Sequence, residues 1–160
     1  MDQMRRKVIG TGGAGLLAAS MPASMAFAQG APIKIGMSMP QTGGLGAGGQ
    51  AALIGLRMWI EDVNARGGML GRKVDLIVYD DQSNGANTPG IYTKLIDVDK
   101  VDLLIAPYAT NVTAPIMPMV KERGLLLMGN FSFQVNAKVQ HDMWFNNAPG
   151  GTQRVGQRAS

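Results

Sequence analysis

Short apolar segments alternate with amphipathic segments over residues 33–146 of this 160-residue chain. Residues 50–66 carry apolar side chains at three- and four-residue steps, which predicts a helix with one face against a sheet, and Gly67 and Gly68 end it. Its apolar face consists of Leu53, Leu56, Ile60 and Val63. The segments between the helices are apolar on both faces, which is typical of buried parallel strands. The predicted strands are residues 33–39, 74–79, 101–106, 125–128 and 143–146, and two further helices are predicted at residues 89–98 and 112–123.

Strands that alternate with helices predict an α/β fold, a doubly wound parallel sheet with helices on both faces and right-handed crossovers. In such a sheet, ligands bind beyond the carboxyl ends of the strands, near the point where the strand order reverses. This rule selects the four loops at residues 40–49, 80–84, 107–111 and 129–133. The loops carry hydroxyls, amides, aromatic rings and backbone N–H groups but few charges, so they suit a small polar ligand.

The first 28 residues have the three parts of a secretory signal peptide. Basic residues 5–7 precede a charge-free stretch, and Ala26-Phe27-Ala28 offers the small side chains that signal peptidase accepts. We therefore predict cleavage after Ala28. The pair Arg5-Arg6 resembles a twin-arginine leader, and both this route and general secretion stay open. An uncleaved membrane anchor is the alternative.

Composition and charge narrow the classes of function. The chain has no cysteine, which excludes disulfides, thiol catalysis and cysteine-zinc sites, and its only histidine, His141, cannot form a two-histidine metal site. We expect His141 to be a surface residue with a structural partner. The net charge is +4, but the basic residues are scattered instead of forming a stripe, so we predict no nucleic-acid partner.

Candidate catalytic and cofactor motifs do not fit their patterns. Residues 36–40 resemble a nucleophile elbow, but Pro40 stands where a glycine is required. Asp80 and Asp81 are adjacent at a strand end, so their side chains point to opposite faces and favour turn capping over shared chemistry. The glycine motif at residues 10–15 has no carboxylate about 20 residues further on, where a dinucleotide fold needs one. The motif at residues 44–49 begins about five residues beyond its strand, and Asp80 lies 31 residues past Gly49 instead of about 20. No catalytic residue, metal or cofactor is predicted.

The glycine segment at residues 44–49 has two interpretations that the sequence leaves open. Its backbone either approaches a small ligand closely, or the segment is a flexible loop that only closes a turn.

Three blocks of this sequence resemble the first lobe of a type I periplasmic solute-binding protein, of the family that serves branched-chain amino acid ABC transporters. They are IKIGMSMPQTGGLGAGGQ, GLRMWIEDVNARGGMLGRKVDLIVYDDQSN and DKVDLLIAPYATNVTAPIMPMVKERGLLLMGNFSF. The middle block is the most specific because its motifs follow in one order and spacing.

The resemblance implies a receptor, not an enzyme. Two lobes close on an amino acid or another small carboxylate or amide in the periplasm, and the loaded protein docks on an ABC transporter permease. The resemblance also assigns residues 29–150 to the first lobe and residues 151–160 to the start of the crossover to a second lobe that this chain lacks. A sensory module of the same fold and an exported nucleotide-dependent oxidoreductase are the alternatives.

The resemblance also implies a set of ligand-binding residues on three loops. The ligand's carboxylate is held by the loop after the third strand, the Ser132 hydroxyl holds its polar head, and residues 45–48 cover its side chain. The implied ligand-binding residues are Leu45, Gly48, Tyr108, Ala109, Thr110, Asn130, Phe131 and Ser132.

Two departures from the family pattern bear on the ligand. Ala109 stands where many relatives have serine, and the glycines at positions 46, 48 and 49 leave room where amino acid binders often carry a bulky residue. Both departures admit larger aromatic or dicarboxylate ligands.

Overall fold

Five parallel strands form one sheet in the computed structural model, which describes residues 30–133 and 135–147. The strand order is β2-β1-β3-β4-β5, and every neighbouring pair is parallel. The strands are β1 (Ile33–Met39), β2 (Val74–Asp80), β3 (Leu103–Tyr108), β4 (Leu127–Asn130) and β5 (Trp144–Asn146). The predicted α/β sheet is confirmed, with strand ends shifted by at most two residues. The predicted signal peptide and the predicted crossover segment lie outside the described residues.

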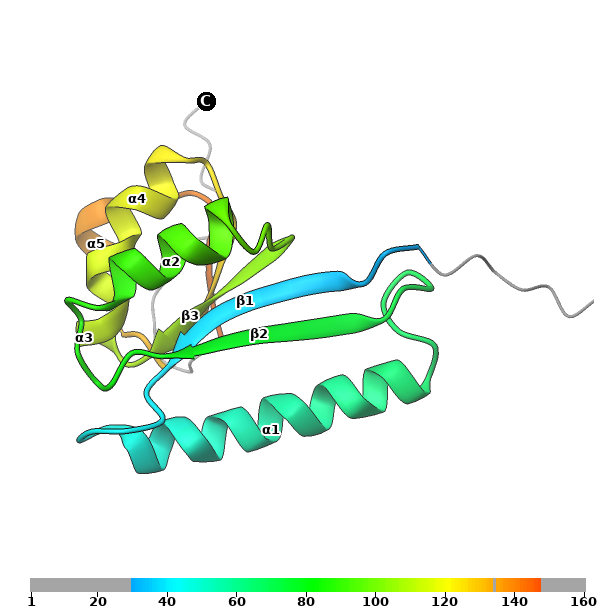
Figure 1. Cartoon of the computed structure of the whole chain (residues 1–160). Coiled ribbons are helices and arrows are strands. Elements are labelled where there is room, and N and C mark those ends of the chain that lie inside the picture. Colours follow the sequence, from blue (N-terminus) through cyan, green and yellow to red (C-terminus); the bar gives the residue numbers. More distant parts are fainter. Residues whose placement is uncertain (1–29, 134, 148–160) are drawn as a thin grey trace, which may run out of the picture.

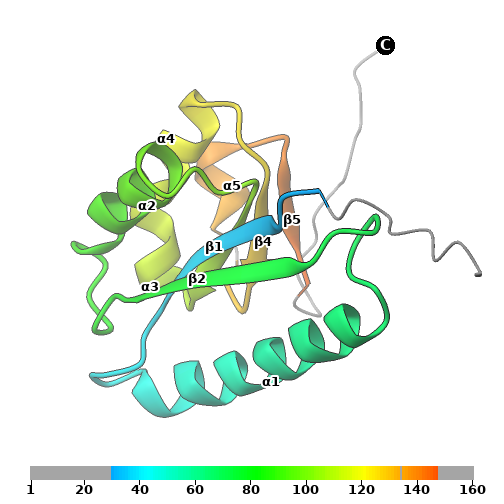
Figure 2. The same ribbon diagram turned by 45° about the vertical axis from the view of Figure 1, so that its right-hand side comes forward.

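Helices cover both faces of the sheet (Figure 1). The long helix α1 lies alone on one face, and the shorter helices lie together on the other, as the turned view in Figure 2 also shows. None of the described helices is long and apolar enough to cross a membrane. The helices are α1 (Gly46–Ala65), α2 (Thr88–Asp97), α3 (Thr110–Thr113), α4 (Met117–Glu122) and α5 (Asn136–Val139), with the 3₁₀ turn η1 (Ala114–Ile116) between α3 and α4.

Two helix predictions need correction. The first helix begins at Gly46, four residues before the predicted start, so the glycines at 46, 48 and 49 form its first turn and are not part of a loop. The predicted helix 112–123 is divided into α3, η1 and α4 because Pro115 and Pro118 lack the N–H groups that a continuous helix needs.

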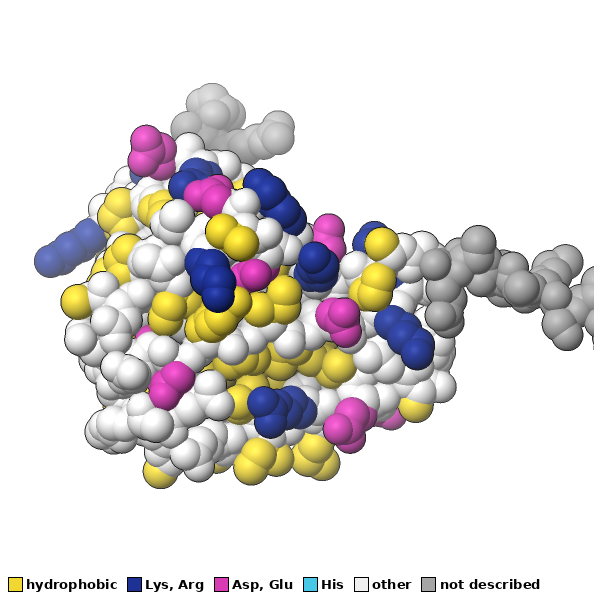
Figure 3. Space-filling model, in the orientation of Figure 1, with side chains coloured by type: hydrophobic (Ala, Val, Ile, Leu, Met, Phe, Trp, Pro, Cys, Tyr) yellow, Lys and Arg dark blue, Asp and Glu magenta, His cyan; other side chains and the backbone are white. Residues whose placement is uncertain are grey.

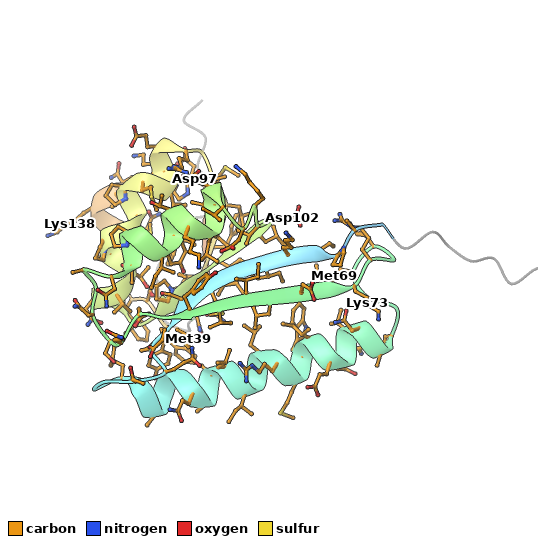
Figure 4. All side chains as sticks on the ribbon, in the orientation of Figure 1. Met39, Met69, Lys73, Asp97, Asp102 and Lys138 are labelled. Carbon is orange, nitrogen blue, oxygen red and sulfur yellow. The ribbon has the colours of Figure 1, made fainter. Side chains whose placement is uncertain are left out.

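The core has one layer on each side of the sheet. Leu53 and Ile60 of α1 pack on alternate residues of β1, which confirms the predicted apolar face of this helix. Figure 4 shows the side chains that fill this layer, with Met39 at the end of β1 nearest the start of α1. On the other face, the fully buried Tyr92 of α2 donates its hydroxyl hydrogen to the Ile105 carbonyl. Burial raises the pKa of this hydroxyl, which therefore stays protonated.

The face of the sheet on which α1 lies is covered unevenly. Met128 and Phe145 are partners in the register of β4 and β5, and they share a face with Ile105, which packs in the α1 layer. Met128 is 47% exposed and Phe145 is 43% exposed. No described helix lies over this half of the face, although parallel sheets are normally buried on both sides.

Candidate functional site

The strand order reverses between β1 and β3. The chain leaves β1 toward β2 on one side and then returns past β1 to β3 on the other, which makes the carboxyl ends of these two strands the expected binding position. In Figure 1 both arrowheads point toward the start of α1 and toward α3. Tyr108 is the register partner of Asn130, so the loops after β3 and β4 begin side by side.

Three of the predicted ligand-binding residues meet at this edge. The rings of Tyr108 and Phe131 have centroids 5.4 Å apart and are tilted by 49°. A Cβ atom on Gly48 would lie 2.9 Å from atoms of the Tyr108 ring. The first turn of α1 is therefore the surface on which the Tyr108 ring rests, and only glycine fits there without displacing it. The Tyr108 hydroxyl has no hydrogen-bond partner among the described residues.

Two non-glycine residues beside these rings have strained backbones. Ala109 has φ 96° and ψ 154°, a region that glycine alone adopts readily, and Phe131 has φ 55°. Such conformations persist only where the surrounding structure enforces them, and they concentrate at binding and catalytic sites. Ala109 and Phe131 follow two neighbouring strands at the same edge of the sheet, and the other described non-glycine residues with positive φ lie in other segments: Leu70, Gln82, Ser83, Lys100 and Gln140.

A buried hydroxyl pair holds the two strained loops together. The Thr113 hydroxyl donates to the Ala109 carbonyl at 2.8 Å and lies 2.7 Å from the Ser132 hydroxyl. Both side chains are fully buried. We expected the Ser132 hydroxyl to hold the polar head of a ligand, but in this structure it points inward and binds Thr113. This partner could not be predicted from the sequence, because Thr113 lies in a helix beyond the loop.

The exposed Thr110 connects the loops after β3 and β4 at the protein surface. Its exposed hydroxyl accepts a hydrogen bond from the Phe133 N–H at 3.1 Å and donates to the Phe133 carbonyl at 3.2 Å. Phe133 is 52% exposed, and it lies in the predicted loop 129–133 but was not among the implied ligand-binding residues. Asn130 is half-buried at the end of β4, and its side-chain amide has no partner among the described residues.

The loop after β1 is tethered to the loop after β2. The Asp80 carboxylate accepts hydrogen bonds from the Thr42 hydroxyl at 2.7 Å and the Gln41 N–H at 2.9 Å. The Ser83 hydroxyl donates to the Thr42 carbonyl at 2.7 Å and accepts from the Leu45 N–H at 3.0 Å. Leu45 is thus held at the start of α1, and the segment has fixed contacts that a freely moving connection would lack.

The pKa of Asp80 lies below its ordinary value. Partial burial acts to raise the pKa of this carboxyl, but the hydrogen bonds from the Thr42 hydroxyl and from the N–H groups of Gln82, Gln41 and Thr42 outweigh it. Asp81 behaves in the opposite way, because burial raises its pKa despite hydrogen bonds from Ser38 and Ser83. The two carboxylates cap turns, as predicted.

Asp80 is expected to stabilise the fold only while it is charged. Because its folded-state pKa is depressed, its contribution is complete above the unfolded pKa and is lost as the pH falls below about 4 and through the folded value. The free energy of unfolding, measured by urea titration between about pH 3 and 6, should fall less steeply with acidification in Asp80→Asn than in the native protein. Asp81 is present in both proteins, so a difference between their two pH profiles comes from Asp80. Identical pH profiles of the two proteins would contradict this assignment.

Two other polar residues have structural partners. The buried Ser38 donates its hydroxyl hydrogen to Asp81 at 2.9 Å, and a ring nitrogen of His141 lies 2.7 Å from the Leu125 carbonyl. His141 is only 4% exposed, so the expectation of a surface position is wrong, while that of a structural partner is confirmed. Among residues 30–133 and 135–147, no three His, Cys, Asp or Glu side chains gather as a metal site would require.

A separate groove runs along the edge strand between α1 and β2. It has a volume of about 350 Å³ and is lined by Arg57, Ile60, Glu61, Leu76 and Val78. Figure 3 shows hydrophobic side chains gathered along this strand, with Lys and Arg side chains interspersed among Asp and Glu instead of forming a basic patch. The groove lies away from the strand ends, the strained loops and the aromatic rings, so we do not assign it to the binding site.

A five-stranded parallel sheet with helices on both faces and a switch point between β1 and β3 is an α/β lobe of the predicted kind. The family model described as periplasmic binding protein matches residues 32–157, and the chain belongs to this family. The predicted family and the type I lobe fold are thereby confirmed.

Relatives and solved structures agree with this membership. The Leu/Ile/Val-binding protein BraC3 of Rhizobium johnstonii is 31% identical over 114 residues, which cover 70% of this chain and 31% of the relative. The substrate-binding protein LivJ of Streptococcus pneumoniae, solved with isoleucine, superposes with a TM-score of 0.68 at 26% identity, over 73% of this chain and 34% of that protein. A solute-binding protein of Rhodopseudomonas palustris, solved with benzoate, has a TM-score of 0.63 at 25% identity over 72% of this chain and 32% of that protein. The chain thus spans about a third of the length of these proteins.

Proposed function

We propose that this chain forms the first lobe of an extracytoplasmic receptor of an ABC importer. The receptor captures an amino acid or a similar small carboxylate between two lobes and delivers it to a membrane permease without transforming it. The observation that carries the proposal is the convergence of Gly48, Tyr108, Thr110 and Phe131 at the switch point of a periplasmic-binding-protein lobe. The names of the matched relatives, among them an amino acid binding protein of Pseudomonas aeruginosa, support the class of ligand.

The proposed receptor has a second lobe and an exported location. Residues 29–150 form the first lobe, residues 151–160 begin the crossover, and residues 1–28 act as the signal peptide that directs the protein to the periplasm. The chain's coverage of about a third of its relatives supports a second lobe. The exposed Met128 and Phe145 also support it, since a longer chain can cover them.

Within the proposed site the residues have different tasks. The Tyr108 hydroxyl and the Asn130 amide are donors toward the ligand, and the Thr110 hydroxyl holds Phe133 beside them. Charge-assisted hydrogen bonds to a carboxylate are about twice as strong as neutral ones, which suits these donors. Ser132 and Ala109 position the two loops, and Leu45 and Gly48 set the start of α1 beneath the Tyr108 ring.

Removing the Thr110 hydroxyl, which holds the Phe133 backbone through two hydrogen bonds, is expected to weaken binding by roughly fivefold, about 1 kcal/mol, without unfolding the protein. Isothermal titration of the full-length protein with L-leucine, L-isoleucine and benzoate measures the effect in Thr110→Ala, and Thr110→Ser should restore affinity. Thr93→Ala, an exposed threonine on α2, serves as the control. Absence of binding to all three ligands in the native protein would reject the proposed function.

A further inference from the structure

Aromatic rings are unusually exposed at the carboxyl edge of the sheet. Phe131 is 47% exposed and Phe133 is 52% exposed, and both lie in the loop after β4, where the Phe131 ring contacts the half-buried Tyr108. Single exposed apolar residues are common on protein surfaces, but a cluster of rings at one place marks a binding surface. This cluster coincides with the site assigned to the ligand.

The structure holds two of these rings in fixed positions. Tyr108 is seated on Gly48 on one side and contacts Phe131 on the other, with the two ring planes tilted by 49°. Phe131 keeps its ring there at the cost of a positive φ, which is a genuine outlier for a bulky residue. A backbone strained to present an aromatic ring beside another ring provides a preformed wall for a flat ligand group.

The polar groups of this edge suit a carboxylate better than an ammonium group. The loops at residues 40–49, 107–113 and 129–133 contain no charged residue. Asp80 lies on the neighbouring loop, but the Thr42 hydroxyl and three N–H groups already occupy its carboxylate. The Tyr108 hydroxyl and the Asn130 amide have no partner among the described residues, so both can donate to a ligand carboxylate.

We propose that the receptor prefers an aromatic carboxylate without an amino group to an aliphatic amino acid. This inference rests on the proposed function and names its class of ligand. The ligand ring packs against Phe131 and Tyr108, and its carboxylate accepts hydrogen bonds from the Tyr108 hydroxyl and the Asn130 amide.

The test compares four ligands in isothermal titrations of the full-length protein: benzoate, 4-hydroxybenzoate, L-phenylalanine and L-leucine. We expect benzoate or 4-hydroxybenzoate to bind at least tenfold more tightly than L-leucine, and more tightly than L-phenylalanine, which has the ring and also the ammonium group. Phe131→Ala should weaken binding of the preferred acid about tenfold. Phe131→Tyr, which keeps a ring, should preserve it.

Phe145→Ala is the matched control, because Phe145 is similarly exposed but lies on β5 outside the site. Tighter binding of L-leucine than of both aromatic acids would overturn the aromatic preference and leave the proposed receptor function intact. Equal losses in Phe131→Ala and Phe145→Ala would overturn the assigned position of the ring. Failure of all four ligands to bind would reject the proposed function itself and the inference with it.

Discussion

Replacing Gly49 by alanine is expected to lower the free energy of unfolding by about 3 kcal/mol. A Cβ atom at this position would lie 2.0 Å from the Pro40 carbonyl oxygen, far inside van der Waals contact. That oxygen belongs to the backbone at the end of β1, so relief requires α1 to move away from the strand. Urea denaturation of the full-length protein, followed by circular dichroism, measures the change.

Gly55→Ala is the matched control on the same helix. A Cβ atom there meets nothing within 4 Å, and alanine has the higher helix propensity, so this variant should gain up to about 1 kcal/mol. A Gly49→Ala protein as stable as Gly55→Ala would show that the close approach of α1 to β1 is not a feature of the native fold. The packing of the Tyr108 ring on Gly48 would then be contradicted as well, because it requires the same position of α1.

Thr113→Val is expected to destabilise the protein by about 2 kcal/mol although the side chain keeps its shape. The hydroxyl that is lost bonds the Ala109 carbonyl at 2.8 Å and the Ser132 hydroxyl at 2.7 Å in a fully buried position. Valine leaves the Ser132 hydroxyl buried with only long contacts to backbone carbonyls, at 3.5 Å. Ligand affinity should fall as well, because the loops after β3 and β4 lose their internal connection.

The Ser132 partner provides a double-mutant cycle. Ser132→Ala alone should cost about 1 kcal/mol or less, since Thr113 keeps its bond to the Ala109 carbonyl. The double variant should be more stable than the sum of the two single effects predicts, because no hydroxyl is then left unpaired. Strict additivity would contradict the buried pair.

The strands could be predicted from the sequence because burial on both faces leaves a continuous apolar run. The start of α1 could not, since three glycines in its first turn have poor helix propensity, and packing against Pro40 and Tyr108 outweighs that preference. The positions of Tyr108, Thr110 and Phe131 at one edge followed from the strand order.

The directions in which these side chains point could not be predicted from the sequence. A serine in a loop reads as a candidate ligand contact, but the helical Thr113 that turns Ser132 inward is 19 residues away in the chain. The same holds for His141, whose partner Leu125 lies on a preceding segment 16 residues earlier. The strain at Ala109 and Phe131 is equally invisible, because neither residue type signals a positive φ.

We expect a small carboxylate to bind at the carboxyl edge of β1, β3 and β4. A titration of the isotope-labelled full-length protein with its tightest-binding acid, followed by amide chemical shifts, tests it most directly. The largest shifts are expected at Thr110, Phe131 and Phe133. Shifts confined to the groove between α1 and β2, at residues such as Arg57 and Val78, would contradict it and place the ligand elsewhere.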